Sequence, residues 1–589
     1  LKKVMLDNKN SQFITTSIDN NFQISNKKIL AGDWCLDNEN NNKSDLLSCP
    51  WGNNKNLSED YFLSQKILDN YAKKLSRYLN NFHNKNFPDR YWNILILPWL
   101  AYYIPGELYR WRLVEKALEK DSNLIFSDIK IDKIEIPYTK DYLDLLSSDQ
   151  FFNYQIFKKI LIFLSNNGKK INFISKEINQ NEFITKTYNK SKSKTKKKFL
   201  PITLDYLSSF FSKFNNIFID RRIFKFKNYV KLSLKLFQFP SFYYYKFNYR
   251  FDHINLRHVK IDREKRNKIN FSDGEDDLFH KYLNENIKYD IPKCFLEAYD
   301  LINHESHKIK LKPRIILSAV LHYHNEVFKF WLARNVIKNK TKFFSSSHGG
   351  GNQLKYCPDL QFENTIVDKK FTWTLPVKDK DIQLPPGKFI NFKSSRSDKK
   401  FLIYLEKAIT LFPAKIGNGQ NNYLRLNFDN VINLKKSLSK EIYKNFFYLP
   451  TGEHEAKMQE TIRNSIQEKF VNKKNVFYKY IDKSKLVICP YMETAFLESV
   501  ITGPTILIND FEKAPLQGNV KSLQEDLVKN KIVFKNIEDA TAHINESWHQ
   551  IDKWWLSNEV QNTLYKFKKN FCNLQDDPIN KWTKFLTNI

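Results

Sequence analysis

The chain has 589 residues, of which 42% are hydrophobic and 15% aromatic, and this composition excludes a disordered protein. Its formal net charge is +31, with an isoelectric point near 9.5, so phosphate in nucleic acid, anionic membranes and nucleotide substrates are the partners that its charge would attract. Because Lys is abundant along the whole chain, the charge also has a purely compositional interpretation, and the six scattered Cys lack zinc-site spacing and indicate reduced thiols.

The sequence contains no segment that predicts a membrane span. The longest apolar run covers residues 94–106, is too short to cross a bilayer and contains Pro98 and Pro105. The first residues lack an apolar signal core. We therefore expect a cytoplasmic protein, and its charge leaves attachment to the inner face of the membrane open.

In the first part of the chain, short β-branched or aromatic runs alternate with helical patterns. One helix is expected from an N-cap at Ser58 to about Phe82. The alternation predicts an α/β fold with a largely parallel sheet. The expected strands are Gln12–Ser17, Lys27–Trp34, Tyr91–Pro98, Asn123–Ile129, Lys170–Ser175, Pro313–Val320 and Lys342–Ser347.

This rhythm breaks from about residue 180 to 277, which we interpret as a helical insertion. A lysine run covers Thr185–Phe199, and an aromatic run covers Phe237–Phe251. Basic residues interleaved with aromatic ones are typical of nucleic-acid surfaces and of anionic membrane surfaces. A solvated loop followed by an amphipathic helical layer explains the same residues. We expect the run Lys186–Lys198 to contact anionic lipid or a lipid-linked acceptor.

A second set of strands and helices begins near Lys399. The expected strands are Lys399–Ala408, Asn445–Gly452, Lys485–Tyr491, Pro504–Asp510 and Lys531–Asn536. The polar stretch around Asp379-Lys380-Asp381 is interpreted as linker. These patterns predict an N-terminal domain over residues 1–395, a C-terminal domain over 396–545 and a helical tail over 546–589.

Three consecutive glycines, Gly349, Gly350 and Gly351, follow a Ser-rich strand end and His348. Glycine lets backbone N–H groups approach a phosphate or carboxylate closely, and the carboxyl end of a parallel sheet is where open α/β proteins bind ligands. His348 would then act as a base or a phosphate partner, oriented by Asp359, Glu363 or Asp368. The alternative is a tight turn with a structural His. In the first interpretation, Gly350→Val blocks binding and leaves the fold intact.

A second polar cluster follows the strand at Lys485–Tyr491. Glu493, Thr494 and Glu498 lie at the turn and the start of a short helix, which ends at Gly503. Helix N-termini favour anions, and a carboxylate there suits ribose or sugar hydroxyls. An ordinary β-α-β unit with solvent-facing acids is the alternative.

At these segments the sequence resembles GT-B glycosyltransferases, and more closely a family of bacterial transferases for O-antigen and other surface carbohydrates. The residues that carry the resemblance are Thr15-Thr16, Gly32-Asp33-Trp34-Cys35, His348-Gly349-Gly350, Glu363, Asp368, Thr372-Trp373, Thr494, Glu498 and Pro504-Thr505-Ile506. Ser347, Asp33 and Thr374-Leu375 depart from the usual residues of that pattern. The resemblance implies two Rossmann-like domains that face a cleft, and a tail helix that packs back on the first domain.

The resulting hypothesis is a metal-independent glycosyltransferase without a cofactor, which moves a sugar from a nucleotide donor to a lipid-linked or soluble surface glycan. His348, Glu363 and Asp368 are the expected catalytic residues. The residues expected to bind the donor are Gly349, Gly350, Gly351, Lys355, Lys457, Arg463, Glu493, Thr494 and Glu498. A protein that binds nucleic acid or a membrane without catalysis, and a catalytically silent scaffold of polysaccharide assembly, are the alternatives. The chain has no Gly-x-Ser-x-Gly elbow, Walker A loop or dinucleotide turn, and no nucleic-acid-binding motif accompanies its basic, aromatic middle region.

Overall fold

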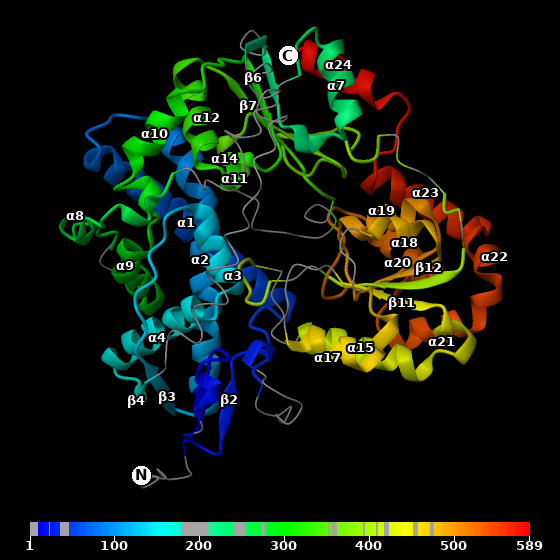
Figure 1. Cartoon of the computed structure of the whole chain (residues 1–589), viewed down its shortest axis with the longest axis horizontal. Coiled ribbons are helices and arrows are strands. Elements are labelled where there is room, and N and C mark those ends of the chain that lie inside the picture. Colours follow the sequence, from blue (N-terminus) through cyan, green and yellow to red (C-terminus); the bar gives the residue numbers. More distant parts are fainter. Residues whose placement is uncertain are drawn as a thin grey trace.

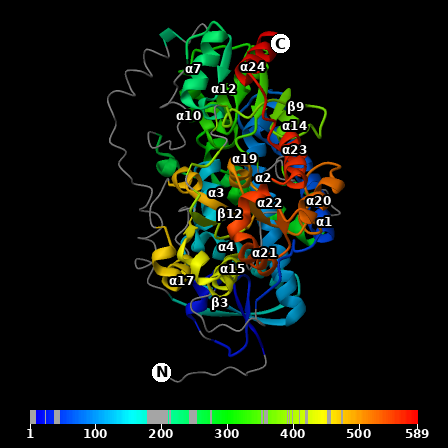
Figure 2. The same ribbon diagram turned by 90° about the vertical axis from the view of Figure 1, so that its right-hand side faces the viewer.

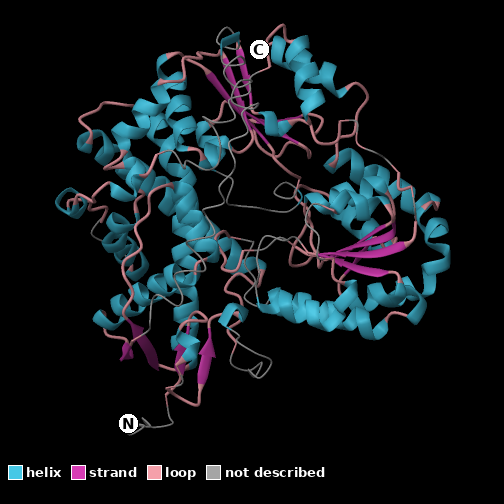
Figure 3. Cartoon of the chain, viewed as in Figure 1, coloured by secondary structure: helices cyan, strands magenta, loops and turns pink. Residues whose placement is uncertain are grey.

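The structure is a computed structural model of the chain. It describes residues 10–22, 24–35, 46–177, 210–211, 215–240, 254–272, 277–350, 354, 362–390, 392, 395–397, 399–407, 410–416, 423–450, 457–471 and 476–589. The described part contains three parallel sheets with helices packed around them (Figures 1 and 3). The predicted α/β class is therefore confirmed. Within this part, no helix is long and apolar enough to cross a membrane.

The first sheet has the order β2-β1-β3-β4, and all its strand pairs are parallel. Its strands are β1 (Gln12–Ile14), β2 (Lys28–Leu30), β3 (Asn123–Ile129) and β4 (Lys170–Lys176). At the carboxyl end of β1, the buried Asp19 accepts hydrogen bonds from Thr15 N at 2.8 Å and Thr16 N at 2.8 Å. Burial raises the pKa of Asp19 to about 6, although these hydrogen bonds oppose the shift. The Thr-Thr pair thus fixes the turn after β1.

The second sheet has the order β5-β6-β7-β8-β9 and is also parallel. Its strands are β5 (Ile217–Ile219), β6 (Ile315–Ser318), β7 (Lys342–Ser346), β8 (Lys369–Thr372) and β9 (Asp381–Gln383). β5 comes from the region that the sequence assigned to an insertion. β9 begins at Asp381, inside the stretch interpreted as linker, so that interpretation was wrong: three residues are too few to show a period.

The third sheet has the order β11-β10-β12-β13-β14. Its strands are β10 (Phe401–Leu405), β11 (Phe446–Leu449), β12 (Ser484–Cys489), β13 (Thr505–Ile508) and β14 (Val533–Phe534). Both faces are covered, because Ile403 and Leu405 pack into one apolar core and Leu402 and Tyr404 into another. All five strands coincide with stretches where the sequence predicted them.

Helices join the first two sheets around one apolar core. They are α1 (Asn54–Phe82), α2 (Asp89–Lys120), α3 (Thr139–Ser148), α4 (Gln150–Asn166), α9 (Leu278–Asp290), α10 (Tyr299–His307), α11 (Leu321–His324), α12 (Glu326–Lys338) and α14 (Phe362–Ile366). Helix α1 ends at Phe82 as predicted but begins four residues before Ser58, capped by Asn53.

The predicted strand at Tyr91–Pro98 is wrong, because these residues lie inside helix α2, which also contains Pro98 and Pro105. Side chains on every face of α2 are buried between the two sheets. A helix that is buried all round has no amphipathic period, so its apolar run cannot be distinguished from a buried strand by pattern.

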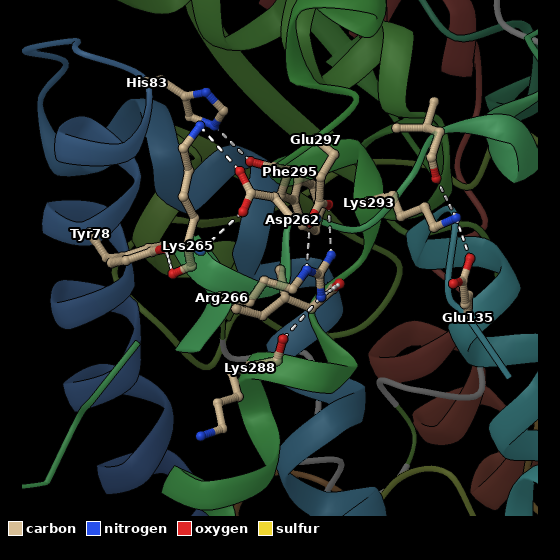
Figure 4. Close-up of polar contacts among 12 residues, drawn as sticks. Tyr78, His83, Glu135, Asp262, Lys265, Arg266, Lys288, Lys293, Phe295 and Glu297 are labelled. Atoms are coloured by element: carbon tan, nitrogen blue, oxygen red, sulfur yellow. Dashed lines mark hydrogen bonds and ion pairs between the residues drawn. The ribbon is translucent and has the colours of Figure 1, made fainter. Parts of the chain in front are cut away.

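The described chain resumes at residue 254, and a polar network holds the segment that begins there against the neighbouring helices (Figure 4). In helix α8 (Arg263–Asn267), the buried Arg266 makes two hydrogen bonds to Glu297, at 2.6 and 2.8 Å, and donates to Ile291 O at 2.9 Å. Nearby, Tyr78 of α1 donates to Lys265 O at 2.7 Å, and the buried Lys293 donates to Val259 O at 2.7 Å. The network satisfies two buried cations, so the segment is a fixed part of the fold.

The last helix, α24 (Pro578–Thr587), packs beside α7 (Phe226–Lys235) on the second sheet, as Figures 1 and 2 both show. Trp582 donates to Pro385 O at 2.9 Å, and its ring lies 5.2 Å from that of Phe224 and 5.0 Å from that of Phe371. The remaining helices surround the third sheet: α15 (Tyr423–Ser437), α16 (Lys440–Lys444), α17 (Lys457–Ile466), α18 (Phe477–Asp482), α19 (Thr494–Thr502), α20 (Lys521–Lys529), α21 (Ile537–Ser547), α22 (Ile551–Trp555) and α23 (Asn558–Phe571).

Candidate active site

A cavity of about 260 Å³ lies where the carboxyl ends of β6 and β7 meet the start of helix α19. In a parallel sheet, loops leave the carboxyl ends of the strands together, and this is where such folds place their sites. The lining residues are Tyr102, Ala319, Val320, Tyr323, His324, Ser346, Ser347, His348, Gly349, Glu363, Lys370, Lys415, Glu493 and Thr494.

Asp220 holds the loop that follows β6 in place. Its side chain is buried at the carboxyl end of β5 and accepts a hydrogen bond from Ala319 N at 3.2 Å. It also pairs with Arg222 Nε at 3.0 Å. A carboxylate that accepts backbone N–H groups from a neighbouring loop fixes the shape of that loop, and Ala319 lines the cavity.

A buried network of ionisable side chains forms one wall of the cavity. Glu363 of α14 accepts from His322 Nε2 at 2.9 Å and pairs with Lys370 Nζ at 2.7 Å. His322 Nδ1 lies 3.1 Å from Ser318 Oγ at the end of β6. Burial would raise the pKa of Glu363, but Lys370 and His322 outweigh it and lower that pKa to about 2. Glu363 is therefore ionised and has two partners, which suits it to hold Lys370 and not to accept a proton.

His348 lies at the mouth of the cavity in an exposed position. Enclosure by the protein is the largest cause that lowers the pKa of His348, and the positive charges of Lys388 and Arg222 lower it further, while Asp220 opposes them. Its imidazole is therefore mainly neutral at pH 7. A neutral imidazole is able to accept a proton from a hydroxyl group.

The glycines pack directly against helix α19. A Cβ atom on Gly349 would lie 2.4 Å from Thr494 Oγ1, and one on Gly350 would lie 2.1 Å from Leu497 Cδ1. Leu497 is fully buried. A valine at position 350 would force Leu497 to shift inside its apolar core, so we now expect Gly350→Val to destabilise the fold as well as to block binding. The two polar segments found in the sequence lie against one another.

Helix α19 presents its N-terminus to the cavity through Glu493 and Thr494. Glu493 occupies the N-cap position, but its side chain does not accept a capping hydrogen bond. The first N–H groups of a helix have no partner within the helix, and they carry the positive end of its dipole. This end of α19 is therefore suited to an anion.

Glu498 lies one turn further along α19 and does not line the cavity itself. It is 7% exposed and accepts a hydrogen bond from Tyr478 Oη at 3.1 Å. Burial raises its pKa, while Lys388, the hydrogen bond from Tyr478 and Lys225 oppose the shift. The carboxyl group of Glu498, on a helix that packs on the third sheet, thus interacts electrostatically with two basic residues near the second sheet, Lys225 and Lys388.

Comparison with known proteins places the chain in a family. The sequence profile of the LIC12162 family transferases matches residues 11–586. The chain belongs to the LIC12162 transferase family. It is therefore an enzyme of the transferase class, and the resemblance to a transferase family found in the sequence is confirmed. No curated protein matches the sequence.

Two solved structures share a distant likeness with this transferase. One is a mutant of S. aureus TarM in complex with fondaparinux, α-GlcNAc-glycerol and UDP, at 12% identity and a TM-score of 0.33. That match covers 49% of this chain and 59% of TarM, less than two thirds of its length. The other, from Listeria monocytogenes, is described as a UDP-N-acetylglucosamine 2-epimerase, at 10% identity and a TM-score of 0.30, with coverage of 48% and 75%.

The remaining expected site residues of this transferase lie elsewhere. Asp368 precedes β8 at the opposite edge of the sheet, where it pairs with Arg90 at 2.8 Å and accepts from Phe343 N, so the fold does not bring it to His348. Arg463 is exposed on α17 and stacks on Phe470. The backbone of Lys457 starts α17, but its side chain, like all of Gly351, Lys355 and Asp359, lies outside the described residues.

Sequence reasoning missed His322, Lys370 and Asp220. His322 belongs to a His-x-His pair directly after a predicted strand, and this pair was the available signal. Lys370 and Asp220 gave none, because a Lys in a Lys-rich chain and an Asp in an apparent insertion are not distinctive. Among the described residues, no group of three or more His, Cys, Asp or Glu side chains is arranged to hold a metal ion.

Proposed function

We propose that this transferase moves a glycosyl group from a nucleotide-activated donor to a glycan acceptor of the bacterial surface, of the O-antigen or capsule type. The single observation that supports it most is the meeting of His348, Gly349 and the N-terminus of α19 at one cavity. A site for glycosyl transfer needs a place for phosphate next to a base, and these three features supply both.

The phosphate of the donor would lie at the N-terminus of α19. Backbone N–H groups there, together with Lys370 and Lys415 in the cavity wall, stabilise the negative charge that develops on the departing nucleotide. Glu363 holds Lys370 in place through their 2.7 Å ion pair.

His348 would act as the base. As the acceptor oxygen forms a bond to the anomeric carbon, the acceptor hydroxyl gives its proton to the neutral imidazole. The bond between the anomeric carbon and the phosphate oxygen breaks at the same time, and the nucleotide leaves with that electron pair. Glu498 would bind a hydroxyl of the nucleotide, next to the phosphate end of the same helix.

A nucleotide screen tests this proposal. CMP, UDP, GDP and dTDP are added separately to the full chain, and the melting temperature is measured. We expect one of them to stabilise the protein, since a ligand that binds only the folded state raises its stability. Glu498→Ala should weaken that binding by about 1–3 kcal/mol, as for a lost hydrogen bond to a charged group.

The sugar donor of the stabilising nucleotide is then tested for turnover. Release of nucleotide that depends on His348 supports the proposal. A protein that no nucleotide stabilises, or a nucleotide-bound structure with the ligand far from His348 and α19, would overturn it.

A further inference from the structure

Helix α7 and the turn that follows it expose apolar side chains to solvent. Leu234 is 62% exposed, Phe237 is 98% exposed and Phe239 is 44% exposed. The ring of Phe239 lies 5.2 Å from that of Phe211, which is 50% exposed. These four residues, with Phe226 at 58% exposure, form what we call the α7 apolar surface. A group of large apolar side chains that are exposed side by side is typical of an interaction site.

The side chain of Phe237 is almost fully exposed and lies outside the apolar cores of the described residues. It follows the C-cap of α7 with a φ of +54°, in the left-handed region, where Gly or Asn is preferred and a bulky residue is strained. Gln238 N donates to Ser233 O at 3.1 Å, so the turn is a Schellman motif, in which this position ordinarily carries glycine. A ring kept there at 98% exposure therefore points to a contact outside the chain.

The charge around this surface identifies the chemistry of its partner. Residues 221–240 contain six basic residues and no acidic one. Lys227 and Lys231 are exposed on α7, and α24 beside it exposes Lys581 and Lys584. Exposed aromatic and aliphatic side chains flanked by lysines, on an amphipathic helix, match the interface of an anionic lipid bilayer, where rings enter the headgroup region and lysines meet lipid phosphates.

We infer that the α7 apolar surface docks this transferase on an anionic membrane. The surface lies on the side of the second sheet that is near α19, because the charge of Glu498 on that helix acts on Lys225, the residue before α7. An acceptor held in the bilayer by a lipid would thus be presented beside the cavity. This last step rests on the proposed function, whereas the docking itself does not.

Vesicle co-sedimentation of the full chain tests the docking. We expect binding to vesicles that contain phosphatidylglycerol, little binding to phosphatidylcholine alone, and a decrease as salt rises. Lys227→Ser combined with Lys231→Ser should weaken binding by roughly 25-fold, since each basic residue near an anionic surface contributes about fivefold. Lys436→Ser with Lys440→Ser, two exposed lysines beside the third sheet, is the matched control and should have little effect.

Phe237→Gly separates docking from folding. Glycine suits the left-handed turn, so the melting temperature should stay equal or rise, while vesicle binding should fall several-fold; Leu556→Gly, at a residue that is 65% exposed elsewhere, should not affect binding. Unchanged vesicle binding in both the Phe237 and the lysine variants would overturn the inference. So would variants that lose RNA binding or self-association while vesicle binding persists. The rise in melting temperature with nucleotide is measured on the same variants. If vesicle binding is lost but this rise is kept, the proposed function is unaffected by the docking result.

Discussion

His348 and Glu363 both line the cavity, but their surroundings give them different ionisation states. At the mouth of the cavity, enclosure by the protein lowers the pKa of the His348 imidazole most, and the positive charges of Lys388 and Arg222 lower it further. Glu363 is buried against Lys370 and His322, which keep its carboxyl group ionised. Two titratable groups whose environments shift their pKa values in this way have separate tasks. The first is suited to proton transfer and the second to holding a cation.

We expect His348→Ala to lower turnover by roughly 10²–10⁴-fold, the usual contribution of an acid–base residue. The melting temperature should change little, because the side chain is exposed. Initial rates with the donor from the nucleotide screen measure the effect, and His304→Ala, at an exposed position on α10, is the control. Normal turnover in the His348→Ala variant would contradict a catalytic role and would show that the imidazole is only a structural part of the turn.

Glu363 should make stability depend on acid pH. Folding lowers its pKa from 4.5 to about 2, so the unfolded chain binds more protons as the pH falls. Its stabilisation is therefore complete above pH 4.5 and is lost between about pH 4.5 and 2.

Urea unfolding of the wild type and of Glu363→Gln from pH 7 to 3 measures this contribution. At pH 7 we expect the variant to be less stable by about 3–5 kcal/mol, because Lys370 loses its buried partner. The difference should shrink as the pH falls. A gap that does not depend on pH would show that Glu363 acts through packing alone.

Helix α19 connects the second and third sheets at the cavity. Its first turn meets the glycines after β7, and its C-terminal end is held by the buried Arg396, which donates to Ser499 O at 3.0 Å and to Pro504 O at 2.8 Å. Burial lowers the pKa of Arg396 to about 9. Because both ends are held by packing and hydrogen bonds, a displacement of the glycine loop would move the N-terminal end of the helix at the cavity.

Gly350→Ala should therefore destabilise the protein by roughly 1–3 kcal/mol, the usual cost of overpacking, and should weaken nucleotide binding at the same time. Leu497→Ala provides the matched test, because removing Cδ1 makes room for the new methyl group. In a double-mutant cycle by urea unfolding, the double variant should be more stable than the sum of the single effects predicts. Strict additivity would contradict the packing described between Gly350 and Leu497.

The three sheets form one molecule because segments distant in sequence cover one another. Helix α24 returns from the third-sheet unit to the second sheet, where the fully buried Trp582 contacts Phe224 and Phe371. Phe371 follows Lys370 on β8, so the tail supports the strand that carries one wall of the cavity.

We expect Trp582→Ala to lower the free energy of unfolding by about 3–5 kcal/mol, the usual cost for a buried Trp. Chemical unfolding measures this loss, and the exposed Lys581→Ala serves as its control. Thermal shift with the stabilising nucleotide should also decrease for the Trp582 variant. Wild-type stability in that variant would mean that the tail does not hold the second sheet.

The sequence alone determined the strands that have several consecutive apolar or β-branched residues. Asn123–Ile129 and the five strands of the third sheet follow such runs, because strand propensity and burial act locally there. It also singled out the His-Gly segment and the start of α19, because glycine and helix-end chemistry are rare and local signals. The α/β class follows from the alternation of these elements.

Only the tertiary structure decided the rest. Residues 91–98 are helical because α2 is buried on every face, and the short strands β5, β8 and β9 form because neighbouring strands supply their hydrogen bonds. Asp368 and Glu363 are five residues apart, yet one lies at the amino edge of the sheet and the other lines the cavity. His322 reaches Glu363 across 41 positions of sequence. Such placements depend on sheet order and helix packing, which join segments that no local pattern relates.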